Sequence, residues 1–140
     1  MLALVLGWQI GLHADPVKAA APAMPALKLD ATNVDSPYPT IDQIGQVCVC
    51  DVVIVSLDTG ATVPSHSCTI RVISHPVSSR VPLGSTLHAS IPLSKFIDRL
   101  HPGRYSVILR IYVGHDASPD GAREIDSDPT MFVIAAGLRR

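Results

Sequence analysis

Three cysteines and one histidine are the residues whose types and spacing most directly suggest metal chemistry. They are Cys48, Cys50, His66 and Cys68. If the two segments that carry them are neighbouring strands, all four side chains lie on one face and offer soft ligands to Zn²⁺ or Cu⁺. Structural zinc sites more often use cysteines separated by two residues. We therefore expect no cofactor, and we keep these four residues as the alternative metal site.

The same cysteines can instead pair with one another. Cys48 and Cys50 lie ~6.6 Å apart along an expected strand, which is a strained spacing for a mutual bond. In an oxidising compartment Cys68 is then the partner of one of them, closing a loop of about twenty residues worth roughly 3 kcal/mol. The equally good alternative is three reduced, buried thiols.

A second candidate for chemistry is the segment from Val55 to Thr62, which reads Val-Ser-Leu-Asp-Thr-Gly-Ala-Thr. An apolar strand that ends in Asp58, Thr59 and Gly60 resembles the active-site loop of retroviral-type aspartic proteases. In that family two such aspartates, one from each subunit, share a proton and activate water, so the resemblance implies a homodimer. The chain has no convincing glycine-rich flap. We favour the alternative that Asp58 and Gly60 build a hairpin turn, with Asp58 bonded to backbone.

The remaining residue types form no recognised catalytic motif. The six histidines are dispersed, and none has the spacing of helical metal ligands. The chain has no phosphate-binding glycine loop and no nucleophile elbow. Aromatic residues are only 4% of the chain, too few for a stacking surface that would bind sugars or single-stranded nucleic acid. We therefore predict a protein that is not an enzyme and has no catalytic residue.

Length and charge limit the number of domains and the classes of partner. The 140 residues suffice for one domain with a proper core. The 11 Lys and Arg nearly balance the 12 Asp and Glu, and only 16% of the residues are charged. The sequence therefore favours a protein partner or self-association over nucleic acid or an anionic membrane. The apolar content of 47% predicts a folded chain.

The N-terminal segment predicts export. Residues 2–12 are almost entirely apolar, too short to span a membrane but suited to a signal sequence, and small residues that allow cleavage lie between Ala14 and Met24. We expect an extracytoplasmic protein, periplasmic or secreted, with a signal-like segment and Pro/Ala linker over residues 1–26. Residues 14–25 are expected to lie outside the core. The alternative is an uncleaved apolar segment that packs on the domain, and membrane contact is expected only through such a segment.

The rest of the chain, residues 27–140, alternates apolar and polar residues and is rich in Val, Ile and Thr, which favour strands. We expect a short helical turn over residues 95–100, capped by Ser94, and a long polar loop over residues 114–128. Pro92 indicates an edge strand or a strand end. Strands are expected over residues 27–33, 45–57, 68–74, 87–93, 105–113 and 130–135.

The predicted strand over residues 45–57 has an unusually apolar outer face. Its even-numbered residues, among them Val52 and Ile54, are expected to face the core, so Val53 and Val55 face outward. An apolar face on the outside of a sheet predicts a covering partner or self-association.

Several short motifs occur in a fixed order along the chain. They are Gly45 at the start of a long strand, Leu57-Asp58-Thr59-Gly60 at its end, Leu83-Gly84-Ser85, Ile91-Pro92-Leu93-Ser94-Lys95-Phe96, Pro102-Gly103-Arg104-Tyr105-Ser106-Val107 and Ser127-Asp128-Pro129-Thr130-Met131-Phe132-Val133-Ile134. Together they resemble the immunoglobulin-like β-sandwich domains of exported bacterial proteins. The match spans roughly residues 40 to 136 and implies an all-β antiparallel sandwich of about seven strands, without shared catalytic residues. In the Pro-Gly-x-Tyr motif the hydroxyl of Tyr105 is expected to hydrogen-bond loop backbone at the end of the sandwich.

These observations predict a non-enzymatic, exported, immunoglobulin-like binding or accessory module that acts through protein–protein interaction. The expected contact surfaces are the loop over residues 114–128 and the apolar outer face of the strand over residues 45–57. The main alternative is a homodimeric aspartic protease that uses Asp58. A weaker alternative is a zinc- or copper-binding module.

Overall fold

The computed structural model describes residues 4–42, 50–66, 78–114 and 123–137. Within these ranges the regular structure is almost entirely β-strand, with one short 3₁₀ turn. The elements are β1 (Leu4–Val5), β2 (Trp8–Asp15), β3 (Lys18–Ala20), β4 (Ala26–Asn33), β5 (Thr40–Asp42), β6 (Cys50–Ser56), β7 (Thr62–Val63), β8 (Ser78–Arg80), β9 (Thr86–Pro92), η1 (Leu93–Lys95), β10 (Gly103–Val113), β11 (Arg123–Asp126) and β12 (Thr130–Ala135).

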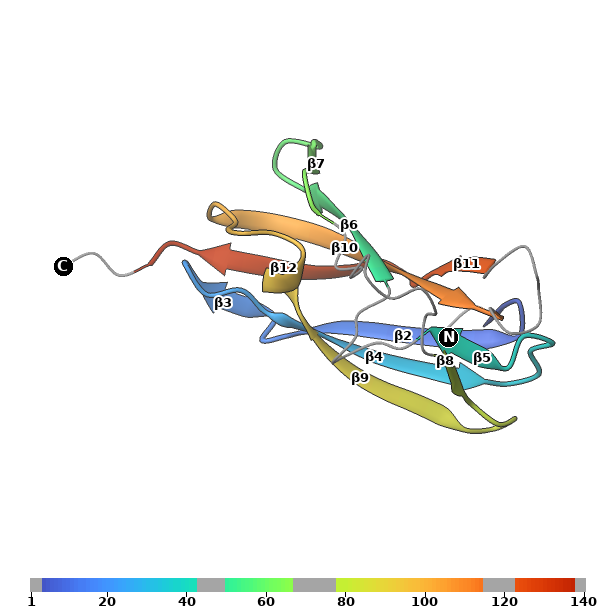
Figure 1. Cartoon of the computed structure of the whole chain (residues 1–140). Coiled ribbons are helices and arrows are strands. Elements are labelled where there is room, and N and C mark those ends of the chain that lie inside the picture. The colour runs from blue at the N-terminus through green and yellow to red at the C-terminus, as the bar shows by residue number, and fades with distance from the viewer. Residues whose placement is uncertain (1–3, 43–49, 67–77, 115–122, 138–140) are drawn as a thin grey trace.

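The strands form two sheets that lie face to face (Figure 1). The first sheet has the order β1-β2-β4-β9, and all its neighbours are antiparallel. The second sheet is built around β10, which pairs with β6 and β5 along one edge and with β12 and β11 along the other. Strands β3, β7, β8 and β11 each pair on one side only and end this sheet. The predicted all-β sandwich is confirmed.

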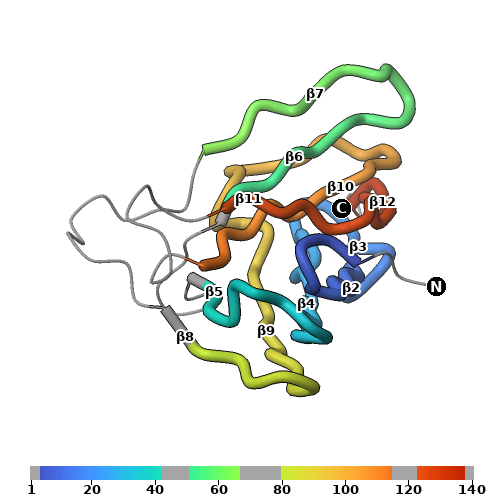
Figure 2. Tube along the Cα trace, turned by 90° about the vertical axis from the view of Figure 1, so that its right-hand side faces the viewer, coloured from blue at the N-terminus to red at the C-terminus, as the bar shows by residue number. Residues whose placement is uncertain are grey.

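The first long strand of the chain takes part in both sheets of the sandwich. The first long strand begins in the first sheet as β2 and continues in the second sheet as β3, which runs parallel to β12. Figure 2 shows this crossing at the edge of the molecule. The chain thus links the edge of the first sheet to the edge of the second sheet before it enters β4.

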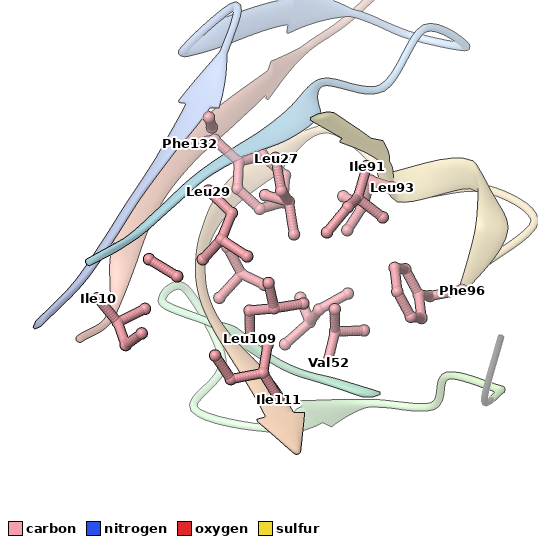
Figure 3. Packing of buried hydrophobic residues seen from close by; sticks show 14 of the residues in the cluster. Ile10, Leu27, Leu29, Val52, Ile91, Leu93, Phe96, Leu109, Ile111 and Phe132 are labelled. Carbon is pink, nitrogen blue, oxygen red and sulfur yellow. The ribbon is translucent and has the colours of Figure 1, made fainter. Parts of the chain in front are cut away.

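Alternation of side chains places the core between the two sheets (Figure 3). Both sheets contribute aliphatic and aromatic side chains with almost no exposed surface, and each such side chain contributes about 1.5–3 kcal/mol when fully buried. The largest are Trp8, Phe96, Phe132, Leu27, Leu29, Ile41, Ile54, Ile91, Leu93, Leu109, Ile111 and Ile125.

The apolar N-terminal segment contains a core strand. Strand β2 pairs with β4 over its whole length, and Trp8 is fully buried and donates its indole N–H to the carbonyl of Tyr38 at 3.0 Å. The expectation that residues 14–25 lie outside the core is wrong, because Ala14 and Ala19 are buried. Small side chains fit here because the chain crosses closely from one sheet to the other.

The alternative of an apolar segment that packs on the domain therefore describes the structure, while cleavage of an export signal stays a prediction. In the part of the chain that the structure describes, no helix is long and apolar enough to cross a membrane.

Most of the predicted strands that fall within the described ranges are confirmed. They appear as β4, β9, β10 and β12, and in β6 the residues Val52 and Ile54 are buried as predicted. Pro92 ends β9, which is the edge strand of the first sheet. The predicted strand over residues 68–74 lies outside the described residues.

The helical turn lies earlier than predicted. The 3₁₀ turn η1 begins at Leu93, and Pro92 occupies the position before it without a side-chain cap. Ser94 is therefore inside the turn and does not cap a helix over residues 95–100. The buried side chains of Leu93 and Phe96 fix the turn, so packing rather than capping decides its position.

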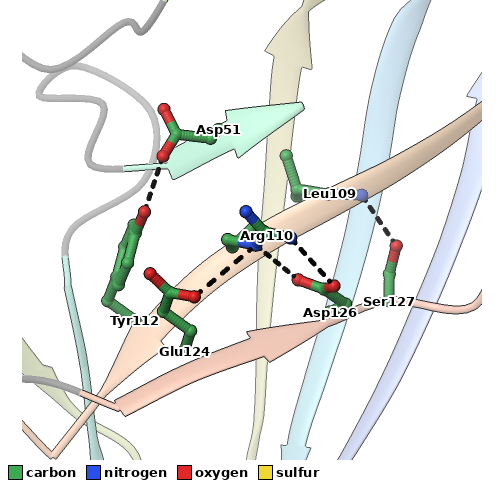
Figure 4. A network of polar contacts seen from close by, with 7 residues as sticks. All are labelled: Asp51, Leu109, Arg110, Tyr112, Glu124, Asp126 and Ser127. Atoms are coloured by element: carbon green, nitrogen blue, oxygen red, sulfur yellow. Dashed lines mark hydrogen bonds and ion pairs between the residues drawn. The ribbon is translucent and has the colours of Figure 1, made fainter. Parts of the chain in front are cut away.

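The predicted loop over residues 114–128 contains a strand. Strand β11 pairs antiparallel with β10 from Arg110 to Val113. Its only buried side chain is Ile125. One apolar residue is too few to show the alternation of apolar and polar residues that predicts a strand. Its polar side chains meet those of β10 instead, and Arg110 bonds Asp126 at 2.9 Å on the outer face (Figure 4).

Candidate functional site

One end of the sandwich carries a cleft beside the β6–β7 hairpin, which projects from the body of the molecule in Figures 1 and 2. The cleft has a volume of about 370 Å³. Residues 61–64 of the hairpin form one wall, and residues 99–102, which precede β10, form the other. Tyr105 of β10 also lines it.

The hairpin wall is shaped by the turn at residues 57–60. Gly60 has a φ of +77° and donates its N–H to the carbonyl of Ser56 at 2.8 Å. The predicted role of Gly60 in the turn is confirmed, because a positive φ favours glycine. The hydroxyl of Ser56 accepts the N–H of Thr59 at 3.3 Å, and the hydroxyl of Thr59 accepts that of Ala61 at 3.2 Å.

We predicted that Asp58 bonds the backbone of its own hairpin turn. In the structure it bonds the start of β10 instead. Its Oδ2 accepts the backbone N–H of Arg104 at 3.0 Å, and its Oδ1 accepts the Nε–H of the same residue at 2.9 Å. Gly103 makes room for this carboxylate, because a Cβ there would lie 2.9 Å from Oδ2. The backbone and side-chain hydrogen bonds from Arg104 lower the pKa of Asp58. The carboxylate is therefore held in its ionised form.

Tyr105 fixes the opposite wall to the core. Its hydroxyl donates to the carbonyl of His101 at 2.5 Å, and its ring stacks on Phe132 at a centroid distance of 5.4 Å. Burial, followed by the nearby charge of Asp58, raises the pKa of this hydroxyl, so it remains a donor. The predicted bond from Tyr105 to loop backbone is confirmed. The bond ties the start of β10 to the chain four residues upstream.

Two polar side chains that line the cleft lack a partner among the described residues, unlike Asp58, which is paired with Arg104. They are Arg99 and His101, which are exposed and have no side-chain hydrogen bond or ion pair within that part of the chain. Leu100 between them is buried. Beyond the lining residues, the N–H of His66 donates to the carbonyl of Phe96 at 2.8 Å and joins the chain after β7 to the chain after η1.

The hairpin also offers free backbone groups. The N–H of Ser56 donates to the carbonyl of Ala61, so these two residues bond across the hairpin. In an antiparallel pair the bonding alternates, and the N–H and C=O of Thr62 therefore point away from β6. Within the described residues they have no backbone partner. Pro64, two residues after Thr62, has no N–H and therefore cannot donate the next hydrogen bond along this edge.

A second, shallower hollow of about 400 Å³ lies on the outer face of the first sheet. Its polar side chains largely bond one another across the strands. His88 Nδ1 lies 2.5 Å from Asp30 Oδ1, and Lys28 Nζ donates to Ser90 Oγ at 3.0 Å. Among the described residues, no three potential metal-ligating side chains come together here or elsewhere.

The alternative metal site cannot be assembled from the described residues. Cys48 and Cys68 lie outside them, and Cys50 is described only through its backbone in β6. His66 is exposed and lies 3.9 Å from Asp98. Cysteine pairing and metal ligation therefore stay predictions.

The predicted apolar outer face is only partly exposed. Val53 and Val55 lie within the second sheet, where β10 and β7 flank β6 and leave them half-buried. The more exposed apolar side chains on this part of the molecule are Leu57 and Met131, at 39% and 61%.

The sequence did not identify the cleft, because its walls are separated in the chain. Val63 and Leu100 are ordinary apolar residues, and Arg99 belongs to no motif. The Pro-Gly-x-Tyr motif was the one available signal, since it predicts a fixed loop at this end. The partner wall depends on the pairing of β6 with β10, which the sequence alone does not give.

No protein-family model, no curated protein and no solved structure matches the chain. The function is therefore argued from the geometry of the cleft and the fold.

Proposed function

We propose that this protein is a non-enzymatic binding module that holds a short extended segment of a partner protein in the cleft between β7 and residues 99–102. The observation that carries the proposal is the combination of apolar walls with unpaired polar groups at the mouth. Binding clefts typically combine an apolar lining with a few polar groups that orient the ligand.

The walls favour one apolar side chain of the ligand. The apolar residues Val63, Pro64, Leu100 and Pro102 are among those that line the cleft. A volume of about 370 Å³ lies at the small end of the range for ligand pockets, roughly 300–1,000 Å³. It therefore suits a residue such as leucine or valine with its flanking backbone rather than a large cofactor.

The charges at the mouth favour a carboxylate on the ligand. Asp58 is already neutralised by Arg104, whereas Arg99 has no ion pair among the described residues. A cationic guanidinium at the rim forms charge-assisted hydrogen bonds with a carboxylate. The ligand is thus expected to carry Asp or Glu, or a C-terminal carboxylate, close to its apolar residue.

The free backbone groups of Thr62 favour an extended ligand. A strand laid beside β7 can bond both the N–H and the C=O of Thr62, as in strand-addition complexes. Because Pro64 limits this pairing, the bound segment is short and its affinity is modest.

The contacts of Asp58 support a binding module over the aspartic protease alternative. The protease mechanism requires two carboxylates that share a proton. Here both oxygens of Asp58 accept hydrogen bonds from Arg104, which favours the ionised form instead. The role of Asp58 is therefore to hold the hairpin wall of the cleft.

Selection from a displayed library of random octapeptides tests the proposal on the full chain. We expect enrichment of peptides with an apolar residue beside Asp or Glu. Arg99→Glu should weaken their binding about 10- to 100-fold, and selection on this variant should enrich Lys or Arg instead. The matched control is Lys28→Glu on the outer face of the first sheet, which should leave binding unchanged. Enriched peptides that bind Arg99→Glu as well as the wild type would contradict the proposal.

A further inference from the structure

Strand β9 is the longest strand that ends a sheet among the described residues. The other terminal strands are short: β1 and β7 have two residues each, β3 and β8 have three, and β11, which pairs only with β10, has four. Strand β9 has seven and pairs on one side only, with β4. Figure 1 shows it along the margin of the first sheet.

The register shows which backbone groups of β9 are free. At the two ends of the pairing, Asn33 N–H donates to Ser85 O at 3.1 Å and Leu93 N–H donates to Pro25 O at 3.1 Å. The odd-numbered residues of β9 therefore bond β4, and the N–H and C=O groups of Thr86, His88 and Ser90 point away from it. They have no backbone partner among the described residues.

Strand β9 has only one of the residues that usually protect a sheet edge from pairing, namely Pro92 at its end. From Thr86 to Ile91 it has no Lys, Arg, Asp, Glu or Pro. On its inner face, Leu87 and Ala89 are only partly buried against the core. A strand added at this edge would therefore gain main-chain hydrogen bonds and cover apolar surface together.

The sequence of β9 is complementary to itself when two copies run antiparallel about His88. Thr86 of one copy then lies opposite Ser90 of the other, and all of the free groups face one another. On the inner face the large Leu87 meets the small Ala89. On the outer face, each His88 is already held by its own Asp30 and each Ser90 by its own Lys28, so no unpaired charge is brought to the junction.

We propose that two copies of this chain pair through β9, antiparallel and centred on His88, so that their first sheets form one continuous sheet. This interface is separate from the cleft, which lies beside β7 of the second sheet. Dimerisation and peptide binding are therefore independently testable.

Sedimentation velocity over a range of concentrations, with the full chain, tests the dimer. The wild type should show a concentration-dependent dimer, and Ser90→Pro should weaken it about tenfold or more, because each junction loses N–H donors and gains a bulky ring. The fold should tolerate this change, since Pro92 already occupies an equivalent outward position on β9. Ser90→Ala is the matched control, because it also loses the bond from Lys28 but keeps the N–H. A wild type that stays monomeric, or equal dimerisation of the two variants, would overturn the proposal.

Cross-linking tests the register independently. Residues 88 of the two copies would form a hydrogen-bonded antiparallel pair with Cα atoms ~5.5 Å apart, which a disulfide can bridge. Under mild oxidation, His88→Cys should give a dimer whose 88–88 disulfide is mapped by mass spectrometry. Thr86→Cys should give no 86–86 disulfide, because these residues lie four residues apart in the register. Equal cross-linking at both positions would overturn the register.

Discussion

The carboxylate of Asp58 and the start of β10 at Arg104 are joined by a pair of hydrogen bonds, from the backbone N–H at 3.0 Å and from Nε–H at 2.9 Å. This contact connects the turn of the β6–β7 hairpin to the strand that follows residues 99–102. It therefore restrains the turn of the hairpin relative to the chain that follows the other wall of the cleft. The residues that first suggested a protease thus have a structural role in the binding site that we propose.

Asp58→Asn should destabilise the protein more at neutral pH than in acid. The pKa of Asp58 is lowered from 3.8 in the folded chain, so its ionised form stabilises the fold at pH values above 3.8. That contribution is lost as the pH falls through the lowered pKa. Urea unfolding at pH 7 and at about pH 2 checks this: the difference in stability between the wild type and the variant should be smaller at pH 2 than at pH 7. A difference that is the same at both pH values would show that the charge of Asp58 is not involved.

Tyr105→Phe should cost about 1–3 kcal/mol of the free energy of unfolding, because the carbonyl of His101 loses its donor at 2.5 Å. The ring and its stacking on Phe132 are retained. Tyr38→Phe is the control, because the hydroxyl of Tyr38 has no hydrogen bond among the described residues, and its cost should stay within about 0.5 kcal/mol. Chemical denaturation measures both variants. Equal costs would argue against a special role for Tyr105.

Ser127→Ala should cost about 1–3 kcal/mol. Ser127 is buried between β11 and β12, where its hydroxyl accepts the N–H of Leu109 at 2.9 Å and its own N–H donates to the carbonyl of Leu109 (Figure 4). The hydroxyl of Ser127 thus accepts a backbone hydrogen bond from β10 in the gap between its two partner strands, β11 and β12. Ser106→Ala, at a half-exposed position on β10 without such a bond, serves as control in the same unfolding measurement. A Ser127→Ala variant as stable as this control would contradict the assignment.

Trp8→Ala should destabilise the protein by about 3–5 kcal/mol, because a fully buried ring is removed from β2.

As the chain has one tryptophan, its fluorescence reports on this strand alone. The emission should be blue-shifted in the native protein and move to longer wavelength on unfolding. Cleavage between Ala14 and Met24 would remove β2, so the folded protein should retain Trp8. A chain that begins after Ala14 and still unfolds cooperatively would contradict this prediction.

The sequence predicted those strands whose inner faces are apolar and whose outer faces are polar. Val107, Leu109 and Ile111 made β10 recognisable in this way. In contrast, β2 is an apolar run near the chain start, and the same composition suits a signal sequence. Strand β11 has one inward apolar residue, Ile125, which is too few for a periodic pattern.

The candidate site was predictable only where one local motif determines it. The bond from Tyr105 to loop backbone lies within four residues of the chain, and the Pro-Gly-x-Tyr motif indicated it. The partner of Asp58 lies 46 residues away, at Arg104. Such a contact depends on which strands become neighbours, and this is decided by packing of the whole sandwich rather than by local pattern.

The most direct test of the proposed binding module is an amide NMR titration of the full chain with one peptide selected from the displayed library. The account predicts that the largest chemical-shift changes fall on Thr62, Val63 and Leu100 at the cleft. They should be lost with Arg99→Glu. Changes centred instead on Lys28, Asp30 and the rest of the outer face of the first sheet, or no changes at all, would contradict it.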